Sequence, residues 1–418
     1  MTQTASTQLG ASAIAHPQDG VGVLAPVPKL HHLEETPVQA RTNGDDEGAD
    51  ELTFQDLPPF PDDVPTAPLL RLSLKKLLDR DPQEETSLWR ACCDLGFFYL
   101  DLRSGEQSKR DSFHEDGDGE LNGDALLKDA DALFHLGEQL FSLPDAEKQK
   151  YDFKDQGSYF GYKGLGSGVL DSKGTRDRNE FYNTSKDDHL GLSERLPAPD
   201  LLQKDDSRAL LKSYMQRSHA IVSLILGQLN SRLGLPSETL QSLHRLRGAS
   251  GDQVRWVRSP PQPMDDRKLA LGEHSDFGSV TILFNRLGGL QVLPPNSEEW
   301  CYVKPLRGHC IVNLGDAMVK FTAGILRSNI HRVVNPPGEQ GGSTRMSLVY
   351  FARPEDEVVL KVLEGSEMIR DKHAAQQGGS ADEEQITAKE WIMRRAMGRR
   401  AGGDWAKSAG TEGERLKQ

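Results

Sequence analysis

The residues of this sequence best suited to chemistry are histidines and a carboxylate. His274 and Asp276 stand two apart in the run LGEHSDFGSVT. Side chains on a strand alternate between its two faces, so we expect both to project to the same side. A histidine nitrogen and a carboxylate oxygen on one side can occupy neighbouring positions around a metal ion. We expect the third ligand to be His331, in the later run SNIHRV.

Two histidines and one carboxylate form the facial ligand set of non-haem Fe(II) oxygenases, which leaves other coordination positions open. Oxygen chemistry needs those positions, whereas a structural zinc site with four protein ligands is closed. An HxD pair with a distant histidine is also a common chance pattern. His274 could be a surface residue, Asp276 a turn residue and His331 a structural histidine with satisfied hydrogen bonds. The residues on the C-terminal side of His331 help to decide between these interpretations.

An arginine and a serine stand there, in the run RMSLVYF. Alternation places Arg345 and Ser347 on one face of a predicted strand. The planar fork of an arginine matches a carboxylate, and a serine hydroxyl adds a further donor. No obvious acidic partner lies nearby in the sequence, so we predict that these two residues hold one end of a dicarboxylate co-substrate. The other end of that molecule would lie on the metal. An internal salt bridge of Arg345 is the alternative.

Composition limits the classes of protein that can carry these residues. The 418 residues have a net charge of -13, which repels phosphate backbones, so we expect no nucleic-acid binding. No apolar run is long enough for a membrane-spanning helix, and the N-terminus lacks the features of a secretion signal. The four cysteines include no CxxC pair and are expected to be buried thiols. We expect a cytoplasmic monomer without a membrane partner.

The chain is expected to contain four regions. Residues 1–62 predict a disordered tail, and residues 63–250 an N-terminal α/β region with scaffold helices. Residues 251–372 predict the β-rich core, and residues 373–418 a C-terminal linker, helix and tail. The acidic segment 103–124 is expected to be a surface insertion. It is not a calcium loop, because the glycine and glutamate that such a loop needs are missing from their positions.

Periodicity predicts helices before the core and short strands within it. Helices are expected at residues 86–93, 124–141, 208–233 and 387–400. Strands are expected at residues 68–72, 95–100, 254–257, 280–284, 290–293, 300–303, 310–314, 331–334 and 347–352, with one more strand-like run after Pro354. Glycine and proline pairs separate the strands of the core, a pattern typical of a sandwich or jelly roll.

The later part of the sequence resembles the Fe(II)/2-oxoglutarate-dependent dioxygenase superfamily, in its isopenicillin N synthase-like branch. The matching pieces stand in order: HSDFGSVTILF, GGLQVL, VNLGD, SNIHRVV and RMSLVYFARP. By this resemblance His274, Asp276 and His331 bind iron, while Arg345 and Ser347 hold the distal carboxylate of 2-oxoglutarate. The fold that it implies is mainly β with flanking α, a double-stranded β-helix (jelly roll) core backed by helices.

The resemblance also implies a reaction. We expect an oxygenase that hydroxylates or desaturates a small organic substrate, such as a secondary metabolite, and releases succinate and CO2. Its cofactors would be Fe(II), 2-oxoglutarate and O2, with ascorbate as reductant. No catalytic side chain is expected beyond the metal centre, because the metal and the co-substrate carry the chemistry. The alternatives are an iron oxidase of the same fold that does not use 2-oxoglutarate, a non-catalytic small-molecule-binding protein, and a zinc hydrolase on a similar barrel.

Aromatic residues are the expected substrate contacts. The glycine-rich run GSYFGYKGLGSG predicts a loop over the pocket, in which Tyr159, Phe160 and Tyr162 would line the mouth. Phe277 and Phe351 would form part of the pocket wall. Ordinary packing is the alternative for all five residues.

The sequence departs from the family pattern at the start of the predicted core. Ser259 stands where related sequences usually carry a tyrosine that helps to hold the co-substrate. By this comparison Arg255 or Arg258 could supply that second contact.

Overall fold

The structure is a computed structural model that describes residues 52–104, 121–262, 269–376, 385–400, 402–404, 408 and 410–411. Most of the predicted tail 1–62 and of the insertion 103–124 lies outside the described residues. The part of that tail from residue 52 onward does contact the folded chain. The backbone N–H of Arg307 donates to the Leu52 carbonyl, and Gln340 Nε2 donates to the Pro58 carbonyl at 2.8 Å. The packed chain therefore begins earlier than the sequence analysis expects.

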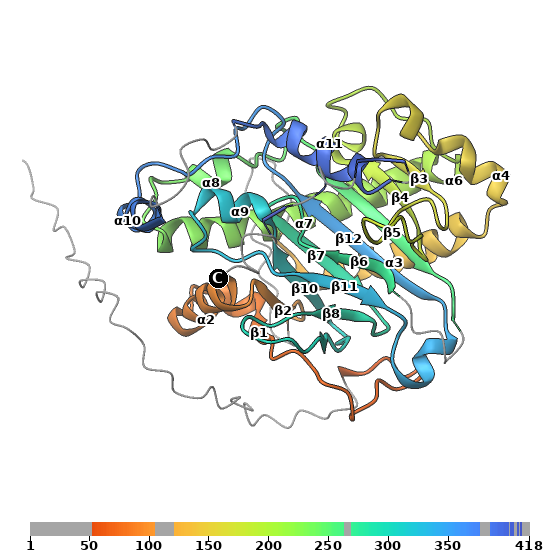
Figure 1. The fold of residues 1–418 in the computed structure, drawn as a ribbon, viewed down its shortest axis with the longest axis horizontal. Coiled ribbons are helices and arrows are strands. Elements are labelled where there is room, and N and C mark those ends of the chain that lie inside the picture. Colours follow the sequence, from red (N-terminus) through yellow and green to blue (C-terminus); the bar gives the residue numbers. More distant parts are fainter. Residues whose placement is uncertain are drawn as a thin grey trace, which may run out of the picture. The chain divides into compact units, whose positions relative to one another are not determined.

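Two β-sheets form the centre of the described chain (Figure 1). In the eight-stranded sheet the order is β1 (Leu70–Ser73), β2 (Phe97–Asp101), β10 (His309–Leu314), β7 (Val280–Asn285), β12 (Arg345–Ala352), β5 (Gln253–Ser259), β4 (Glu180–Ser185) and β3 (Gly161–Lys163). In the four-stranded sheet it is β6 (Leu269–His274), β11 (His331–Val334), β8 (Leu290–Val292) and β9 (Cys301–Tyr302). Apart from the parallel pair β1–β2, neighbouring strands are antiparallel.

The nine strands expected between residues 68 and 352 are present, so the mainly β core is confirmed. The further run expected after Pro354 forms only an isolated bridge, between Val359 and Thr387, in the described part of the chain. Strands β3, β4 and β6 are additional to those expected. β3 lies inside the glycine-rich segment for which the sequence predicts a loop, and its three residues are all buried.

Each strand of the large sheet has two different faces. On β12, Leu348 and Tyr350 belong to the larger hydrophobic cluster, which lies between the sheet and the helices. Ser347 and Val349 point the other way and line a cavity on the inner side of the sheet. Because the side-chain period of a strand is two, one sequence can build the hydrophobic core and the cavity wall together.

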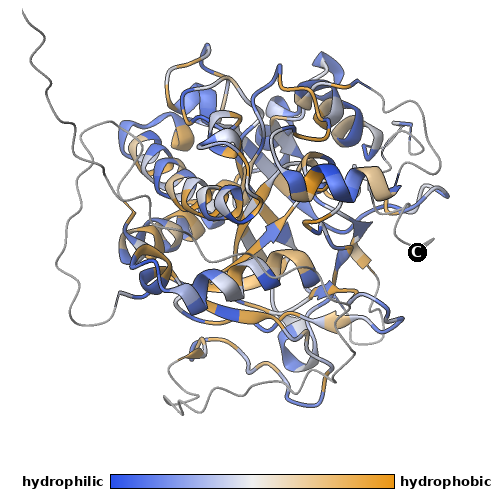
Figure 2. Ribbon diagram, turned by 90° about the vertical axis from the view of Figure 1, so that its left-hand side faces the viewer, coloured by the Kyte–Doolittle hydropathy of each residue, from blue (hydrophilic) through white to orange (hydrophobic). Residues whose placement is uncertain are grey.

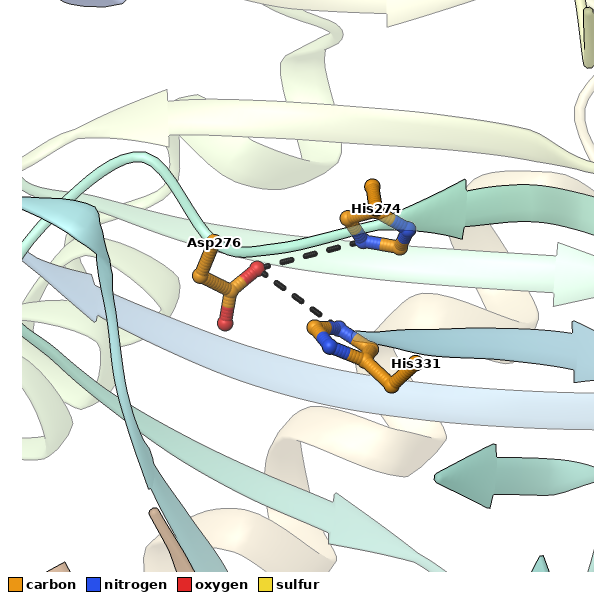
Figure 3. A group of neighbouring side chains, drawn as sticks. All are labelled: His274, Asp276 and His331. Atoms are coloured by element: carbon orange, nitrogen blue, oxygen red, sulfur yellow. Dashed lines mark ion pairs between the residues drawn. The ribbon is translucent and has the colours of Figure 1, made fainter. Parts of the chain in front are cut away.

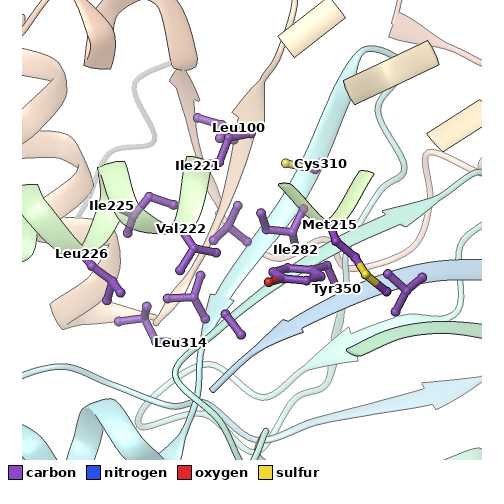
Figure 4. Close-up of a cluster of buried hydrophobic side chains, with 14 of the residues drawn as sticks. Leu100, Met215, Ile221, Val222, Ile225, Leu226, Ile282, Cys310, Leu314 and Tyr350 are labelled. Atoms are coloured by element: carbon purple, nitrogen blue, oxygen red, sulfur yellow. The ribbon is translucent and has the colours of Figure 1, made fainter. Parts of the chain in front are cut away.

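Two long helices pack on the outer face of the large sheet. They are α3 (Gly123–Phe141) and α7 (Asp205–Arg232), and both match predicted helices. Their more hydrophobic residues face inward, toward the strands (Figure 2). Figure 4 shows the contact, in which α7 meets strands β2, β7, β10 and β12 through the side chains of Met215, Ile221, Val222, Ile225, Leu226, Leu100, Ile282, Cys310, Leu314 and Tyr350.

Shorter helices complete the fold. They are α1 (Leu74–Leu78), α2 (Pro82–Asp94), α4 (Asp145–Lys148), α5 (Lys186–His189), α6 (Asp200–Gln203), α8 (Thr239–Ser242), α9 (Asp316–Phe321), α10 (Glu367–Gln376) and α11 (Ala388–Gly398). The last of these begins with a capping box, in which Thr387 and Glu390 satisfy each other's backbone N–H groups. Among the described helices, none is both long and apolar enough to cross a membrane.

The contact between α7 and the large sheet predicts a stability effect. Ile225 is fully buried in it, so Ile225→Ala should lower the free energy of unfolding by about 2–5 kcal/mol through lost burial and the cavity left behind. Equilibrium urea unfolding followed by circular dichroism measures this change. The matched control is Leu192→Ala, at an exposed leucine, which should stay within about 0.5 kcal/mol of the parent. Equal effects of the two substitutions would contradict this account of the core.

Candidate metal centre

A cavity lies between the inner faces of the two sheets. Its wall takes residues from β2, β5, β7, β10 and β12 of the large sheet and from β6, β8 and β11 of the small one. All five residues predicted to bind the metal or the co-substrate line it: His274, Asp276, His331, Arg345 and Ser347.

The three predicted metal ligands converge at one point of this cavity (Figure 3). His274 ends β6 and His331 begins β11, and the antiparallel register makes these two residues direct partners. Their ring centroids lie 4.2 Å apart. Asp276 Oδ1 lies 3.9 Å from Nε2 of His274 and 3.8 Å from Nε2 of His331. One ligand atom from each residue therefore falls within 4.8 Å of the other two.

Backbone carbonyls orient both imidazoles. Nδ1 of His274 lies 2.8 Å from the Gly272 carbonyl oxygen, and Nδ1 of His331 lies 3.1 Å from that of Asn329. A carbonyl can only accept, so we assign the proton to Nδ1 in both rings, which leaves the Nε2 lone pairs facing Asp276. Burial and the neighbouring His331 hold the pKa of His274 well below its usual range. That ring is neutral, as a metal ligand must be.

The two carboxylate oxygens of Asp276 have different partners. Its Oδ2 accepts hydrogen bonds from Thr281 Oγ1 at 2.6 Å and from Asn313 Nδ2 at 2.7 Å. These contacts turn Oδ1 toward the two imidazoles. Asp276 lies beyond the end of β6, yet the alternation continues, because Ser275 points away and donates to Asp316. The same-side placement predicted for the HxD pair is found, although only His274 belongs to the strand.

A buried ion pair fixes the loop that carries Asp276 from behind. Arg395 of α11 and Asp316 at the start of α9 are fully buried, and their Nη1 and Oδ2 atoms lie 2.5 Å apart. Arg395 also donates to the Ser275 carbonyl at 3.2 Å, and its guanidinium lies 4.4 Å from the ring centroid of Phe277. The backbone N–H of Asp316 donates to the Asp276 carbonyl at 2.8 Å. Both partners of the ion pair therefore hold the backbone beside the ligand.

Arg345 reaches the cavity without a carboxylate partner. It is 3% exposed, and burial lowers its pKa to about 10. Nε donates to the Gly288 carbonyl and Nη1 to Ser347 Oγ, both at 2.7 Å. In the part of the chain that the structure describes, no acid lies within salt-bridge distance of this guanidinium. The internal salt bridge considered from the sequence is absent from that part.

The aromatic residues predicted to contact the substrate fall into two groups. Phe277 and Phe351 line the cavity. Tyr159, Phe160 and Tyr162 are not part of its wall. The hydroxyl of Tyr162 instead donates to Glu180 at 2.5 Å, and Tyr159 packs on Phe160 with ring centroids 4.6 Å apart. Pairing with β4 makes Gly161–Lys163 of this segment a strand, while the residues on either side of it belong to no strand.

Sequence reasoning missed several polar residues of the cavity. Thr281 and Asn313, which bind the Asp276 carboxylate, come from neighbouring strands β7 and β10 and have no local signal in the sequence. Arg353 also lines the cavity. It stands at the same parity as Arg345 and Ser347 along β12 and its continuation, so alternation could have identified it. Arg258 points elsewhere and pairs with Glu180 at 2.5 Å.

Comparisons with known proteins agree with this geometry. The family model of the 2OG-Fe(II) oxygenase superfamily matches residues 251–354, and that of the non-haem dioxygenase in morphine synthesis N-terminal region matches residues 122–203. A 2-oxoglutarate-dependent dioxygenase of Aspergillus fumigatus is 33% identical in an alignment 334 residues long, which covers 74% of this chain and 81% of that protein. The 2-oxoglutarate-dependent dioxygenase gloE of Glarea lozoyensis is 30% identical over 299 residues, or 71% and 83% of the two chains.

Solved structures share the fold. Full-length Neurospora crassa T7H in complex with alpha-KG and 5-formyluracil superposes with a TM-score of 0.61 at 19% identity, covering 78% of this chain and 95% of that one. A 2OG-Fe(II) oxygenase family protein from Caulobacter crescentus gives 0.60 at 23% identity, covering 79% and 98%. The jelly-roll core predicted from the sequence is thereby confirmed.

The chain belongs to the 2OG-Fe(II) oxygenase superfamily. It is a 2-oxoglutarate-dependent dioxygenase that uses Fe(II), 2-oxoglutarate and O2. Hydroxylation or desaturation of a small organic substrate, as expected from the sequence, is consistent with this membership.

The buried ion pair behind the metal loop predicts a second stability effect. Arg395→Met leaves the Asp316 carboxylate buried without its cation, so the free energy of unfolding should fall by about 3–5 kcal/mol. Adding Asp316→Leu should recover part of that loss, because the unpaired charge disappears. Urea unfolding of both variants measures the difference.

Lys389→Met is the control on the same helix. Lys389 pairs with Asp356 near the surface, where its side chain is 62% exposed, so this substitution should cost at most about 1 kcal/mol. A loss for Arg395→Met no larger than that of the control would show that the buried pair does not fix the loop.

Proposed function

We propose that His274, Asp276 and His331 hold the Fe(II) of this oxygenase, and that Arg345 with Ser347 binds the distal carboxylate of 2-oxoglutarate. The observation that carries the proposal is the convergence of two Nε2 atoms and one carboxylate oxygen in a buried cavity. This donor set is the one that non-haem Fe(II) oxygenases use.

The surroundings of the three residues suit iron. Carbonyl acceptors fix the Nδ1 protons, and Thr281 and Asn313 occupy the second oxygen of Asp276, so each residue offers one atom to the metal. Such outer partners orient the ligands and tune their basicity. Bound Fe(II) supplies the redox chemistry with O2. The protein supplies the geometry and a cavity largely enclosed by the two sheets.

The order of residues along β12 leaves room for the co-substrate. Arg345 and Ser347 lie at the beginning of the strand, while Phe351 near its end pairs with Thr281, which donates to Asp276. The guanidinium and the metal ligands therefore occupy different levels of one cavity. In the proposed arrangement a dicarboxylate spans them, with one end on Arg345 and Ser347 and the other on the metal. Charge-assisted bonds from a buried guanidinium are stronger than neutral ones.

The substrate is proposed to be a small organic molecule such as a secondary metabolite. Phe277 and Phe351 offer apolar walls beside the metal ligands, which suits a substrate presenting an unreactive C–H bond. The paired buried Arg345 and Ser347 favour 2-oxoglutarate as co-substrate over an iron oxidase that does without it. The monomeric state, the cytoplasmic location and the absence of nucleic-acid binding are likewise proposals, the last supported by the net charge of -13.

Metal binding tests the triad directly. His274→Ala and Asp276→Ala should each weaken Co(II) binding, a spectroscopic substitute for Fe(II), by at least about a hundredfold, since each removes one of three protein ligands. Titration of the purified chain with Co(II), followed by its visible absorption, measures the affinity. His135→Ala, at an exposed histidine of α3, should bind Co(II) as the parent does. Unchanged binding by either triad variant would remove that residue from the centre.

The co-substrate assignment has its own test. Arg345→Gln should raise the 2-oxoglutarate concentration needed for half-maximal succinate release by about tenfold or more, because a charge-assisted bond contributes about 1.5–3 kcal/mol. Fe(II), ascorbate and a fixed substrate mixture are kept constant. Arg286→Gln, whose side chain pairs with Asp131 of α3 instead, is the control and should leave the requirement unchanged. Equal requirements for parent and Arg345→Gln would exclude Arg345 from the co-substrate site.

A further inference from the structure

Two more arginines line the cavity, and neither belongs to the co-substrate site proposed above. Arg255 lies on β5, directly opposite Val349 of β12, and Arg353 follows the end of β12. Val257 and Ser259, at the same parity as Arg255, face the same cavity. Arg345 and Ser347 lie at the beginning of β12, so the cavity wall carries arginines near both ends of this strand.

Arg255 is held between aromatic rings and by one hydrogen bond. Its guanidinium lies 4.3 Å from the ring centroid of Phe181 and 5.0 Å from that of Phe351. Nε donates to Asn183 Oδ1 at 2.7 Å. Within the described ranges, no acceptor is in hydrogen-bond reach of the two terminal nitrogens. The Arg255 side chain is half-buried and lines the cavity.

Arg353 is buried and also lacks a carboxylate partner. Its Nη1 donates to the Gly251 carbonyl and, at 3.3 Å, to Gln253 Oε1. The guanidinium lies 5.3 Å from the Tyr159 ring centroid, and Nε has no partner atom. Among the described residues, no acid lies within salt-bridge distance of Arg353 or Arg255. Burial and repulsion from Arg353 lower the pKa of Arg255 to about 9, although Asp276 partly offsets the repulsion.

Charges in the cavity do not balance without a further anion. Its described wall contains three arginines and one carboxylate, Asp276. A ferrous ion and the 2-oxoglutarate dianion cancel each other, so two positive charges remain. Uncompensated buried charges are costly, and proteins normally pair them. An unoccupied arginine fork in an active-site cavity is suited to a carboxylate.

We propose that the substrate of this oxygenase is a small organic carboxylate, whose anionic group is bound by Arg255 and Arg353. The inference rests on the proposed function, because it assumes that Arg345 is engaged by 2-oxoglutarate. The apolar body of the substrate lies along Phe277 and Phe351, and its reacting carbon faces the metal ligands. Arg255 and Arg353 are substrate-binding residues in this arrangement and do not take part in the redox step.

Paired ligands test the inference without knowledge of the natural substrate. The probes are 3-phenylpropanoate, indole-3-acetate, naphthalene-2-carboxylate and octanoate, each measured beside its primary amide. Anaerobic calorimetric titration of the full chain with Fe(II) and saturating 2-oxoglutarate keeps the Arg345 site filled. At least one carboxylate should bind about tenfold or more tightly than its amide. Equal binding of every acid and its amide, or no binding of any acid at millimolar concentration, would overturn the inference.

Variants assign that preference to the two arginines. Arg255→Gln and Arg353→Gln should each remove most of the difference between acid and amide, while Arg255→Lys should retain part of it. Arg258→Gln is the matched control, since Arg258 lies on the same strand but pairs with Glu180 outside the cavity. A preference that persists in both glutamine variants would contradict the assignment.

The two proposals fail in different ways. Affinity for 2-oxoglutarate is measured for every variant, and circular dichroism shows separately that each has folded. If the parent binds 2-oxoglutarate and Arg345→Gln binds it more weakly, the proposed function is supported, whatever the result with the acid and amide probes. A loss of 2-oxoglutarate affinity in Arg255→Gln equal to that in Arg345→Gln would instead make Arg255 a co-substrate contact, and would overturn the present inference.

Discussion

The proposed metal centre depends on the register between β6 and β11. Antiparallel pairing sets His331 directly opposite His274, and the chain then turns so that Asp276 meets both rings. A slip of one residue would send His331 to the other face of its strand, because side chains alternate with a period of two. The register of this pair becomes irregular beyond His331, with shifts before and after Val333. Strand pairing is therefore as important to the site as the identity of its ligands.

The two faces of the large sheet have different roles, one in the hydrophobic core and the other in the cavity wall. Its outer face is apolar and packs on α3 and α7, and this contact belongs to the larger of the two hydrophobic clusters. Its inner face carries the arginines, whose burial is unfavourable unless anions accompany them. In the proposed arrangement, the anionic groups of the co-substrate and the substrate pair with these arginines, and this pairing favours binding. The hydrophobic contacts on the other side keep the strands in place meanwhile.

The sequence was most informative where the local pattern and the final environment agree. Apart from β6, the strands from residue 253 onward alternate or are largely apolar, and glycines or prolines stand between them, so they could be predicted. β4 could not, because its buried Glu180 depends on Lys148 and Arg258 from distant parts of the chain. β6 contains Gly272, which obscures its pattern, and β3 is three residues long. The same holds for the site. Spacing predicted that the three residues converge, whereas the contacts of Thr281 and Asn313 with Asp276 could be predicted only by knowing which strands are neighbours.

The ion pair behind the metal loop bears on the order in which the protein is made. Asp316 precedes Arg395 by 79 residues, and Thr411, whose hydroxyl donates to the other oxygen of Asp316 at 2.6 Å, comes later still. Every strand of both sheets comes earlier in the chain than Arg395. A growing polypeptide thus contains the residues of both described sheets before it contains the cation that pairs with Asp316. The loop beside the proposed metal ligands can therefore acquire this support only after the residues of every described strand have been synthesised.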